Sequence, residues 1–119
     1  MSWWRSRART VFTVVAVAEA CTWVGLLAGM GVDAGPLRLR LDQVGQGYAA
    51  LTEPVVAAVR LAARTEGLVL DPTYTGRALS GLVAAVADGE VRPGERVVFL
   101  HSGGLPGLFG HPDAARLVG

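Results

Sequence analysis

The sequence predicts an α/β protein that forms part of a layered domain, in which β-α-β units build a parallel sheet. Short apolar runs at residues 37–41, 68–70 and 96–101 have the length and composition of strands. Between them, residues 52–64 and 75–87 carry apolar side chains at helical spacing. Strands that alternate with helices favour right-handed crossovers and therefore a parallel sheet.

The chain is expected to be one partial domain over residues 1–119. Residues 1–36 are predicted to form an apolar helix followed by a turn, because the break at Gly31–Pro36 is rich in turn-forming residues. Residues 37–119 then form a β-α-β-α-β segment. No internal repeat, low-complexity stretch or linker suggests a second domain.

The first helix of that segment has clear boundary signals. Thr52 is a candidate N-cap, and Glu53 and Pro54 are favoured or tolerated in a first helical turn. Gly67 is expected to end the helix.

The second helix is predicted from four apolar residues at helical spacing, Leu79, Leu82, Val83 and Val86. Asp88 and Gly89 are expected to terminate it. The run RVVFLH at residues 96–101 is the clearest strand, because a continuous apolar run is typical of a parallel sheet covered on both faces.

The composition restricts the possible partners of the chain. Hydrophobic residues make up 51% and charged residues 18%, with a mean hydropathy of +0.41, which is apolar for a small free-standing domain. The net charge is +1 with scattered charges, so we expect no nucleic-acid partner. Cys21 is the only cysteine and neither histidine has a second ligand at metal spacing, so we expect no disulfide within the chain and no metal site.

The first thirty residues allow two interpretations. Residues 1–10 carry three arginines and no acid, and residues 11–30 are mostly apolar over nearly the length needed to span a bilayer. Glu19 opposes insertion, because a carboxylate at the centre of a span costs about 2.5–3.5 kcal/mol on insertion scales. A membrane or targeting segment and a helix buried inside a larger enzyme both remain open. We expect the buried helix and a cytoplasmic protein.

Three loops are candidates for a binding site. Ligands of open α/β sheets sit at the carboxyl ends of the strands, and the loops at Tyr48, at Asp71–Thr75 and at Ser102–Leu105 occupy such positions. Asp71 is expected to cap the turn before Pro72 and not to act as an acid.

Residues 66–110 resemble the C-terminal part of a family of pyridoxal-phosphate enzymes, the D-cysteine desulfhydrases and 1-aminocyclopropane-1-carboxylate deaminases. The motifs that carry the resemblance are DPTYTG and HSGGLPGLFG. The resemblance implies a fold type II enzyme, in which Tyr74 is a catalytic residue that faces the substrate. It also implies that Tyr48 and Thr75 line the substrate pocket. Tyr-Thr-Gly at residues 74–76 resembles the desulfhydrase branch more than the deaminase branch, which has Tyr-Glu-Gly.

The same resemblance implies a cofactor contact at residues 102–104. The hydroxyl of Ser102 would exchange a hydrogen bond with the pyridine nitrogen, at a position where the family commonly has threonine. Gly103 and Gly104 would allow the backbone to approach a flat ligand closely. Arg77 stands where the family usually has a lysine that is not the catalytic one.

The sequence contains no lysine, and all 11 basic Lys/Arg residues are arginine. Enzymes of this family hold the cofactor as an imine on a lysine amine, and arginine holds its proton too tightly to replace it. We therefore expect a C-terminal fragment of a desulfhydrase-like lyase, inactive alone, whose partners are a small amino-acid substrate and the missing N-terminal part or a homologous subunit. The alternative is a noncatalytic binding or membrane-tethered module.

Overall fold

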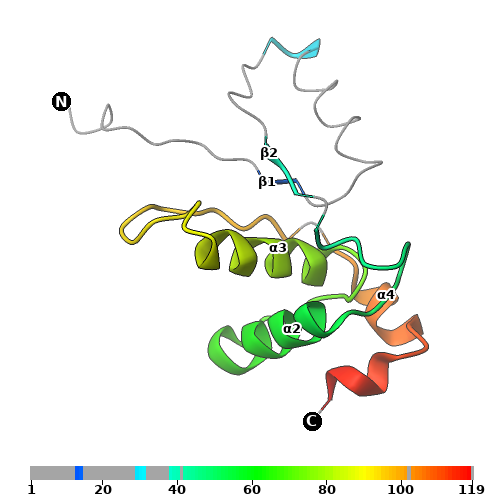
Figure 1. Cartoon of the computed structure of the whole chain (residues 1–119). Coiled ribbons are helices and arrows are strands. Elements are labelled where there is room, and N and C mark those ends of the chain that lie inside the picture. Colours follow the sequence, from blue (N-terminus) through cyan, green and yellow to red (C-terminus); the bar gives the residue numbers. More distant parts are fainter. Residues whose placement is uncertain (1–12, 15–28, 32–37, 41, 102, 119) are drawn as a thin grey trace, which may run out of the picture.

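The computed structural model describes residues 13–14, 29–31, 38–40, 42–101 and 103–118 (Figure 1). Along the chain the elements are the strands β1 and β2, the helices α2, α3 and α4, and the 3₁₀ helix η2. Their bounds are Thr13–Val14, Arg38–Leu39, Glu53–Glu66, Thr75–Ala87, Leu105–Gly110 and Ala114–Leu117. Figure 1 shows α2 and α3 side by side, with α4 at one end of the pair.

Helix α2 begins after Thr52 and stops at Gly67 as the sequence predicts, and it runs two residues beyond the predicted stretch 52–64. Thr52 keeps an extended backbone at the N-cap, although its side chain makes no capping hydrogen bond, and Pro54 lies in the first turn. Gly67 adopts a left-handed conformation with φ 66° and donates its N–H to the last turn of the helix. A side chain at that φ would be strained, so glycine is the residue that allows the chain to leave α2 here.

The core lies between α2 and α3. Val55, Val59 and Ala62 of α2 and Leu70 form its buried cluster, and Leu51, Leu79, Phe99 and Leu117 pack against them. Gly76 permits the close approach of the helices, because a Cβ at this position would lie 2.7 Å from Cγ2 of Val59 and 2.6 Å from the carbonyl oxygen of Asp71.

Helix α3 has the predicted bounds, but its buried face differs from the predicted apolar stripe. The buried residues are Thr75, Gly76, Arg77, Ser80, Gly81 and Ala85. Val83 and Val86 are 43% and 54% exposed. Helix α2 packs on Gly76 of α3 and on Leu79, while Val83 and Val86 of the predicted stripe face outward.

Strand pairing is confined to a short ladder in the described residues. Arg38–Leu39, inside the predicted strand at residues 37–41, pairs in parallel with Thr13–Val14 in the register Thr13 to Arg38 and Val14 to Leu39. Thr13–Val14 is thus a strand in the stretch 11–30 that the sequence predicts as a helix, and most of that stretch lies outside the described residues. No helix in the described part of the chain has the length and apolarity required to cross a bilayer.

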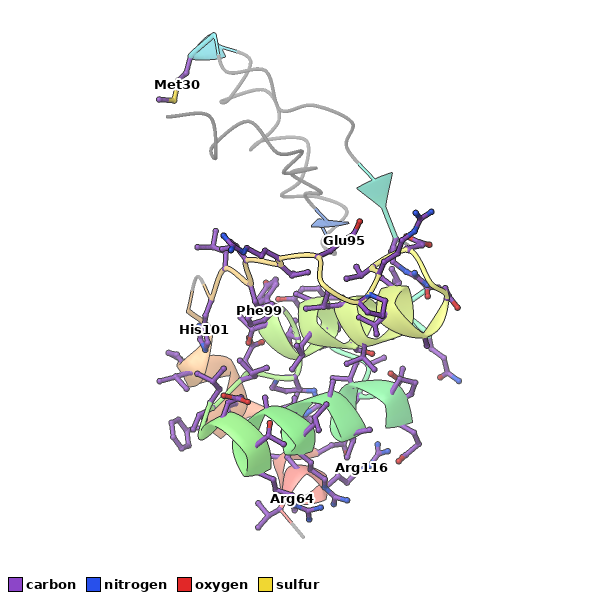
Figure 2. All side chains as sticks on the ribbon, turned by 90° about the vertical axis from the view of Figure 1, so that its left-hand side faces the viewer. Met30, Arg64, Glu95, Phe99, His101 and Arg116 are labelled. Carbon is purple, nitrogen blue, oxygen red and sulfur yellow. The ribbon has the colours of Figure 1, made fainter. Side chains whose placement is uncertain are left out.

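The other two predicted strands are not paired. Residues 68–70 and 96–101 have no ladder partner among the described residues, which corrects the expectation of strands there. The segment after α3 runs back along that helix in both views, and Phe99 points from it toward the helices (Figure 2). Its neighbours Val98 and Leu100 are 92% and 78% exposed. A strand needs a neighbour to bond its backbone, and the described residues provide none at these positions.

Candidate functional site

Asp71 organises the turn that leads into α3. It is fully buried, and its carboxylate accepts hydrogen bonds from the backbone N–H groups of Thr73, Tyr74 and Thr75 at 2.9, 2.8 and 2.9 Å. These are N–H groups at the start of a helix, which have no partner within the helix itself. The prediction that Asp71 caps this turn is confirmed.

The hydroxyl of Thr75 belongs to the same network. It donates to Oδ1 of Asp71 at 2.7 Å and accepts the backbone N–H of Asp71 at 3.0 Å. Thr75 is 3% exposed, so its one hydroxyl proton is directed at Asp71. The structure places Thr75 inside the turn, beneath the exposed Tyr74, and its contact with a substrate stays a prediction.

Tyr48 and Tyr74 come together although 26 residues separate them. Their hydroxyl oxygens are 2.7 Å apart and either can be the donor. The rings meet edge to face, with centroids 6.2 Å apart and an angle of 68° between the planes. Tyr74 is 40% and Tyr48 78% exposed, so the pair presents two phenols at the surface, joined by one hydrogen bond.

The loop that carries Tyr48 is attached to α3 by a residue that we did not predict as part of the site. Arg77 is buried, and its Nη2 donates to the carbonyl oxygens of Gly47 and Ala50 at 2.8 Å each. Sequence reasoning noticed Arg77 only as a replacement for a lysine. The position of a basic residue three after Tyr74, in the first turn of α3, is the signal that could have identified it.

The beginning of this loop is held by charge. Arg40 donates to Asp42 at 2.7 Å, Asp88 at 2.8 Å and Glu90 at 3.1 Å. Hydrogen bonds from Arg40, and to a smaller extent from Gln43, hold the pKa of Asp42 well below the usual range of an aspartate. The bonds to Asp42 and Asp88 in turn raise the pKa of Arg40 above that of a free guanidinium group. The network joins the end of β2 to the residues that follow α3.

Of the two glycines at 103 and 104, Gly104 has a role in packing. Gly104 has φ 113°, and a Cβ there would lie 2.7 Å from Cγ of Asp71. The loop before α4 therefore packs its backbone directly on the buried carboxylate. Gly103 has φ 126° and open space around it, while Ser102 lies outside the described residues. The contacts of all three with a cofactor stay predictions.

His101 connects this loop to the segment before Asp71. Its Nε2 donates to the carbonyl oxygen of Val69 at 2.9 Å, and its Nδ1 accepts the N–H of Gly103 at 3.3 Å. The side chain is exposed beside the start of α4 (Figure 2). No group of His, Cys, Asp or Glu in the described part of the chain could hold a metal ion.

Curated relatives of the chain are D-cysteine desulfhydrases. That of Yersinia enterocolitica is 39% identical over 91 residues, which are 74% of this chain and 28% of the relative. That of Serratia proteamaculans is 38% identical over 82 residues, 68% and 25% of the two chains. That of Klebsiella pneumoniae is 40% identical over 72 residues, 60% and 22%. The chain thus spans about a quarter of the length of the relatives it matches.

The family comparison covers most of the chain. The family described as "Pyridoxal-phosphate dependent enzyme" matches residues 7–103, which include the Tyr48 loop and the DPTYTG turn. Its α/β class agrees with the predicted fold class, while the predicted parallel sheet is represented here only by the ladder of β1 and β2. The alternative of a noncatalytic or membrane-tethered module is not favoured by these matches. The chain belongs to the family of pyridoxal-phosphate dependent enzymes.

Proposed function

We propose that this chain provides the substrate-facing wall of a desulfhydrase-like lyase, which eliminates sulfide from D-cysteine and releases pyruvate and ammonia in the complete enzyme. The observation that carries the proposal is the pair of exposed phenols, Tyr48 and Tyr74, joined at 2.7 Å. The names of the relatives support the reaction type.

The residues of this chain fit the part of a cofactor site that meets the pyridine ring, and not the part that holds the cofactor covalently. The sequence contains no lysine, so no side chain here can hold the aldehyde of pyridoxal phosphate as an imine. The residues assigned to the cofactor ring are Ser102 and the two glycines after it. Gly104 is already packed against Asp71, which leaves Ser102 and Gly103 as the groups that would meet the ring. The covalent attachment has to come from another segment of polypeptide.

The chemistry assigned to this chain is proton handling and orientation. When bound, pyridoxal phosphate stabilises negative charge on the α-carbon of an amino acid, which allows a β-substituent to leave. Tyr74 projects from the capped turn and can hydrogen-bond the substrate, while the hydroxyl of Tyr48 donates or accepts a second hydrogen bond at the Tyr74 oxygen. Because Tyr48 is the more exposed of the two, it can pass a proton between Tyr74 and solvent.

Exposed extended segments support a partner polypeptide. Val69 is 51% and Val98 92% exposed, on segments 68–70 and 96–101, which have no strand partner among the described residues. Apolar extended segments of this kind can pair with further strands. We assign them to the N-terminal part of a complete enzyme or to a homologous subunit, and we place the assembly in the cytoplasm. Recovery of the chain only with detergent would contradict that location.

Complementation with the N-terminal part of the Yersinia desulfhydrase tests the proposal. The chain alone, with pyridoxal phosphate, should release no sulfide from D-cysteine and should form no borohydride-stable adduct on a side chain, because it lacks the amine. Co-expression of the two polypeptides should produce sulfide and pyruvate. The control is the same mixture with Tyr74→Phe, which should lose about 100-fold or more in kcat if the phenol transfers a proton.

Three results would contradict the proposal. Turnover by the chain alone would show that the chain needs no external amine. Full turnover by the mixture carrying both Tyr74→Phe and Tyr48→Phe would remove the phenols from the mechanism. A co-expressed pair that assembles, binds the cofactor and still leaves D-cysteine unchanged would exclude this substrate.

A further inference from the structure

The loop that carries Tyr48 is held through its carbonyl oxygens by side chains from distant parts of the chain. Arg77 donates to Gly47 and Ala50 at 2.8 Å each. His111 Nε2 lies 2.8 Å from the carbonyl oxygen of Ala49, and Arg116 donates to that of Leu51 at 3.2 Å. Four of the five carbonyl groups from 47 to 51 are therefore bound by side chains. A loop outside helices and strands has no regular backbone partners, and these side chains replace them.

The backbone of this loop needs such support. Ala49 has φ 59°, a left-handed conformation that costs a residue with a side chain free energy and persists only when its surroundings enforce it. The carbonyl of Ala49 is the one that His111 binds, and Ala49 directly follows Tyr48. The strained residue thus lies next to the phenol, within the stretch of carbonyl groups that the side chains hold.

Helix α3 positions both tyrosines, Tyr48 through Arg77. Arg77 lies in the first turn of α3, whose N-cap is Tyr74, and it is only 6% exposed. The start of α3 therefore presents Tyr74 directly and fixes Tyr48 through the carbonyl groups on either side of it. The two bonds of Arg77 thus oppose movement of the loop away from α3.

His111 provides a second attachment, from the other side of the loop. A carbonyl oxygen can only accept, so Nε2 donates to Ala49, and Nδ1 accepts the N–H of Asp113 at 3.1 Å. This arrangement requires the neutral ring with its proton on Nε2. His111 directly follows α4, which lies beside the loop in Figure 1.

We propose that Arg77 and His111 are positioning residues that act through Tyr48: they hold its loop so that its hydroxyl stays on that of Tyr74. The catalytic importance of this arrangement rests on the proposed function. The arrangement itself is tested on the full 119-residue chain, without turnover.

The two tyrosines are the only ones in the sequence, so [ζ-¹³C]tyrosine labelling yields one NMR resonance for each. The variants Tyr48→Phe and Tyr74→Phe assign the two signals. The change in the Tyr74 chemical shift between the wild type and Tyr48→Phe then measures the contact between the two hydroxyl groups. In Arg77→Met and in His111→Ala, the Tyr74 signal should move to the position it has in Tyr48→Phe. Adding Tyr48→Phe to either variant should then cause no further change in the Tyr74 signal. The cross-peak between the two tyrosine rings should disappear in Arg77→Met and in His111→Ala.

Rescue and control variants separate positioning from general loss of structure. Both bonds of Arg77 come from a single nitrogen, and its Nε is buried without a partner among the described residues. The ammonium of Arg77→Lys has three donors and can serve both carbonyl groups, so this variant should keep the wild-type Tyr74 signal. Arg92→Gln removes an exposed arginine from the turn after α3 and should leave it unchanged.

The outcomes distinguish the positioning role from the site itself. If Tyr48→Phe leaves the Tyr74 signal of the wild type unmoved, the phenol pair does not exist in solution and the proposed function fails with it. If the wild type shows the shift and both Arg77→Met and His111→Ala retain it, with the helical circular dichroism intact, only the positioning role is overturned. If Arg77→Met unfolds, His111→Ala decides, because that variant leaves the bonds of Arg77 in place.

Discussion

Asp71 is the residue on which most of the local geometry depends. Its carboxylate accepts three backbone N–H groups and the hydroxyl of Thr75, two hydrogens at each oxygen. Its side chain also forms the surface on which Gly104 packs. A buried carboxylate remains tolerable here because it accepts four hydrogen bonds, three of them from backbone N–H groups that a helix start leaves unpaired. The exposed phenol of Tyr74 therefore projects from a rigid turn.

Asp71→Asn is expected to lower the free energy of unfolding by about 3 kcal/mol, because an amide group would direct its NH₂ at backbone N–H donors and leave buried donors unpaired. Urea unfolding followed by circular dichroism measures this change. Asp113→Asn changes an exposed carboxylate and should stay within about 0.5 kcal/mol of the wild type. Equal stability of the two variants would show that the carboxylate of Asp71 does not cap α3.

The helices α2 and α3 pack against each other at a glycine of α3. Gly76 directly follows the capped turn, and both Val59 of α2 and the carbonyl of Asp71 occupy the space that a Cβ would need. The DPTYTG motif thus has two functions in three residues: Tyr74 faces outward, and Gly76 allows the helix behind it to pack. Packing and site geometry are linked at this element.

Gly76→Ala is expected to destabilise the chain by about 1–3 kcal/mol, since the added methyl group overpacks the contact between the helices. The cost of overpacking outweighs the higher helix propensity of alanine, which favours the variant by about 1 kcal/mol. The measurement is the urea midpoint at constant slope. Gly110→Ala places a methyl group at the end of α4, where nothing lies within 4 Å, and should be neutral. A stabilised Gly76→Ala variant would mean that the helices are farther apart.

At the scale of the whole molecule, some apolar side chains are buried between the helices and others remain exposed. The interior between α2 and α3 is closed by Leu70 and Phe99. The side chains of Val98 and Leu100 are largely exposed, on the segment that runs back along α3 (Figure 1). These side chains belong to a run that the sequence predicts as a strand covered on both faces. Phe99 packs on the core, while no layer among the described residues covers Val98 and Leu100.

Val98→Lys is expected to weaken binding of the N-terminal part of the Yersinia desulfhydrase by about tenfold or more, because assembly would bury an unpaired ammonium group. Calorimetric titration of the two purified polypeptides measures the affinity. Ala63→Lys introduces the same charge on the exposed side of α2 and should bind like the wild type. Unchanged affinity of Val98→Lys would place the partner on another face.

Local signals account for what the sequence predicted well. The ends of α2, the bounds of α3 and the capping role of Asp71 follow from residues within a few positions of one another, and short-range hydrogen bonding decides such features. The resemblance of residues 66–110 to a family rests equally on contiguous motifs, and the family match confirms it. The predicted strands at 68–70 and 96–101 did not form, because pairing depends on a neighbour and not on the run itself.

The sequence by itself determined the helix boundaries, the family and the absence of a lysine amine, since each is a property of adjacent residues or of composition. Only the tertiary structure decided that Tyr48 meets Tyr74, that the hydroxyl of Thr75 is directed into the turn, and that His111 holds a loop 62 residues away. The physical reason is distance along the chain. Contacts between remote loops depend on how the helices pack, and no local pattern specifies that packing.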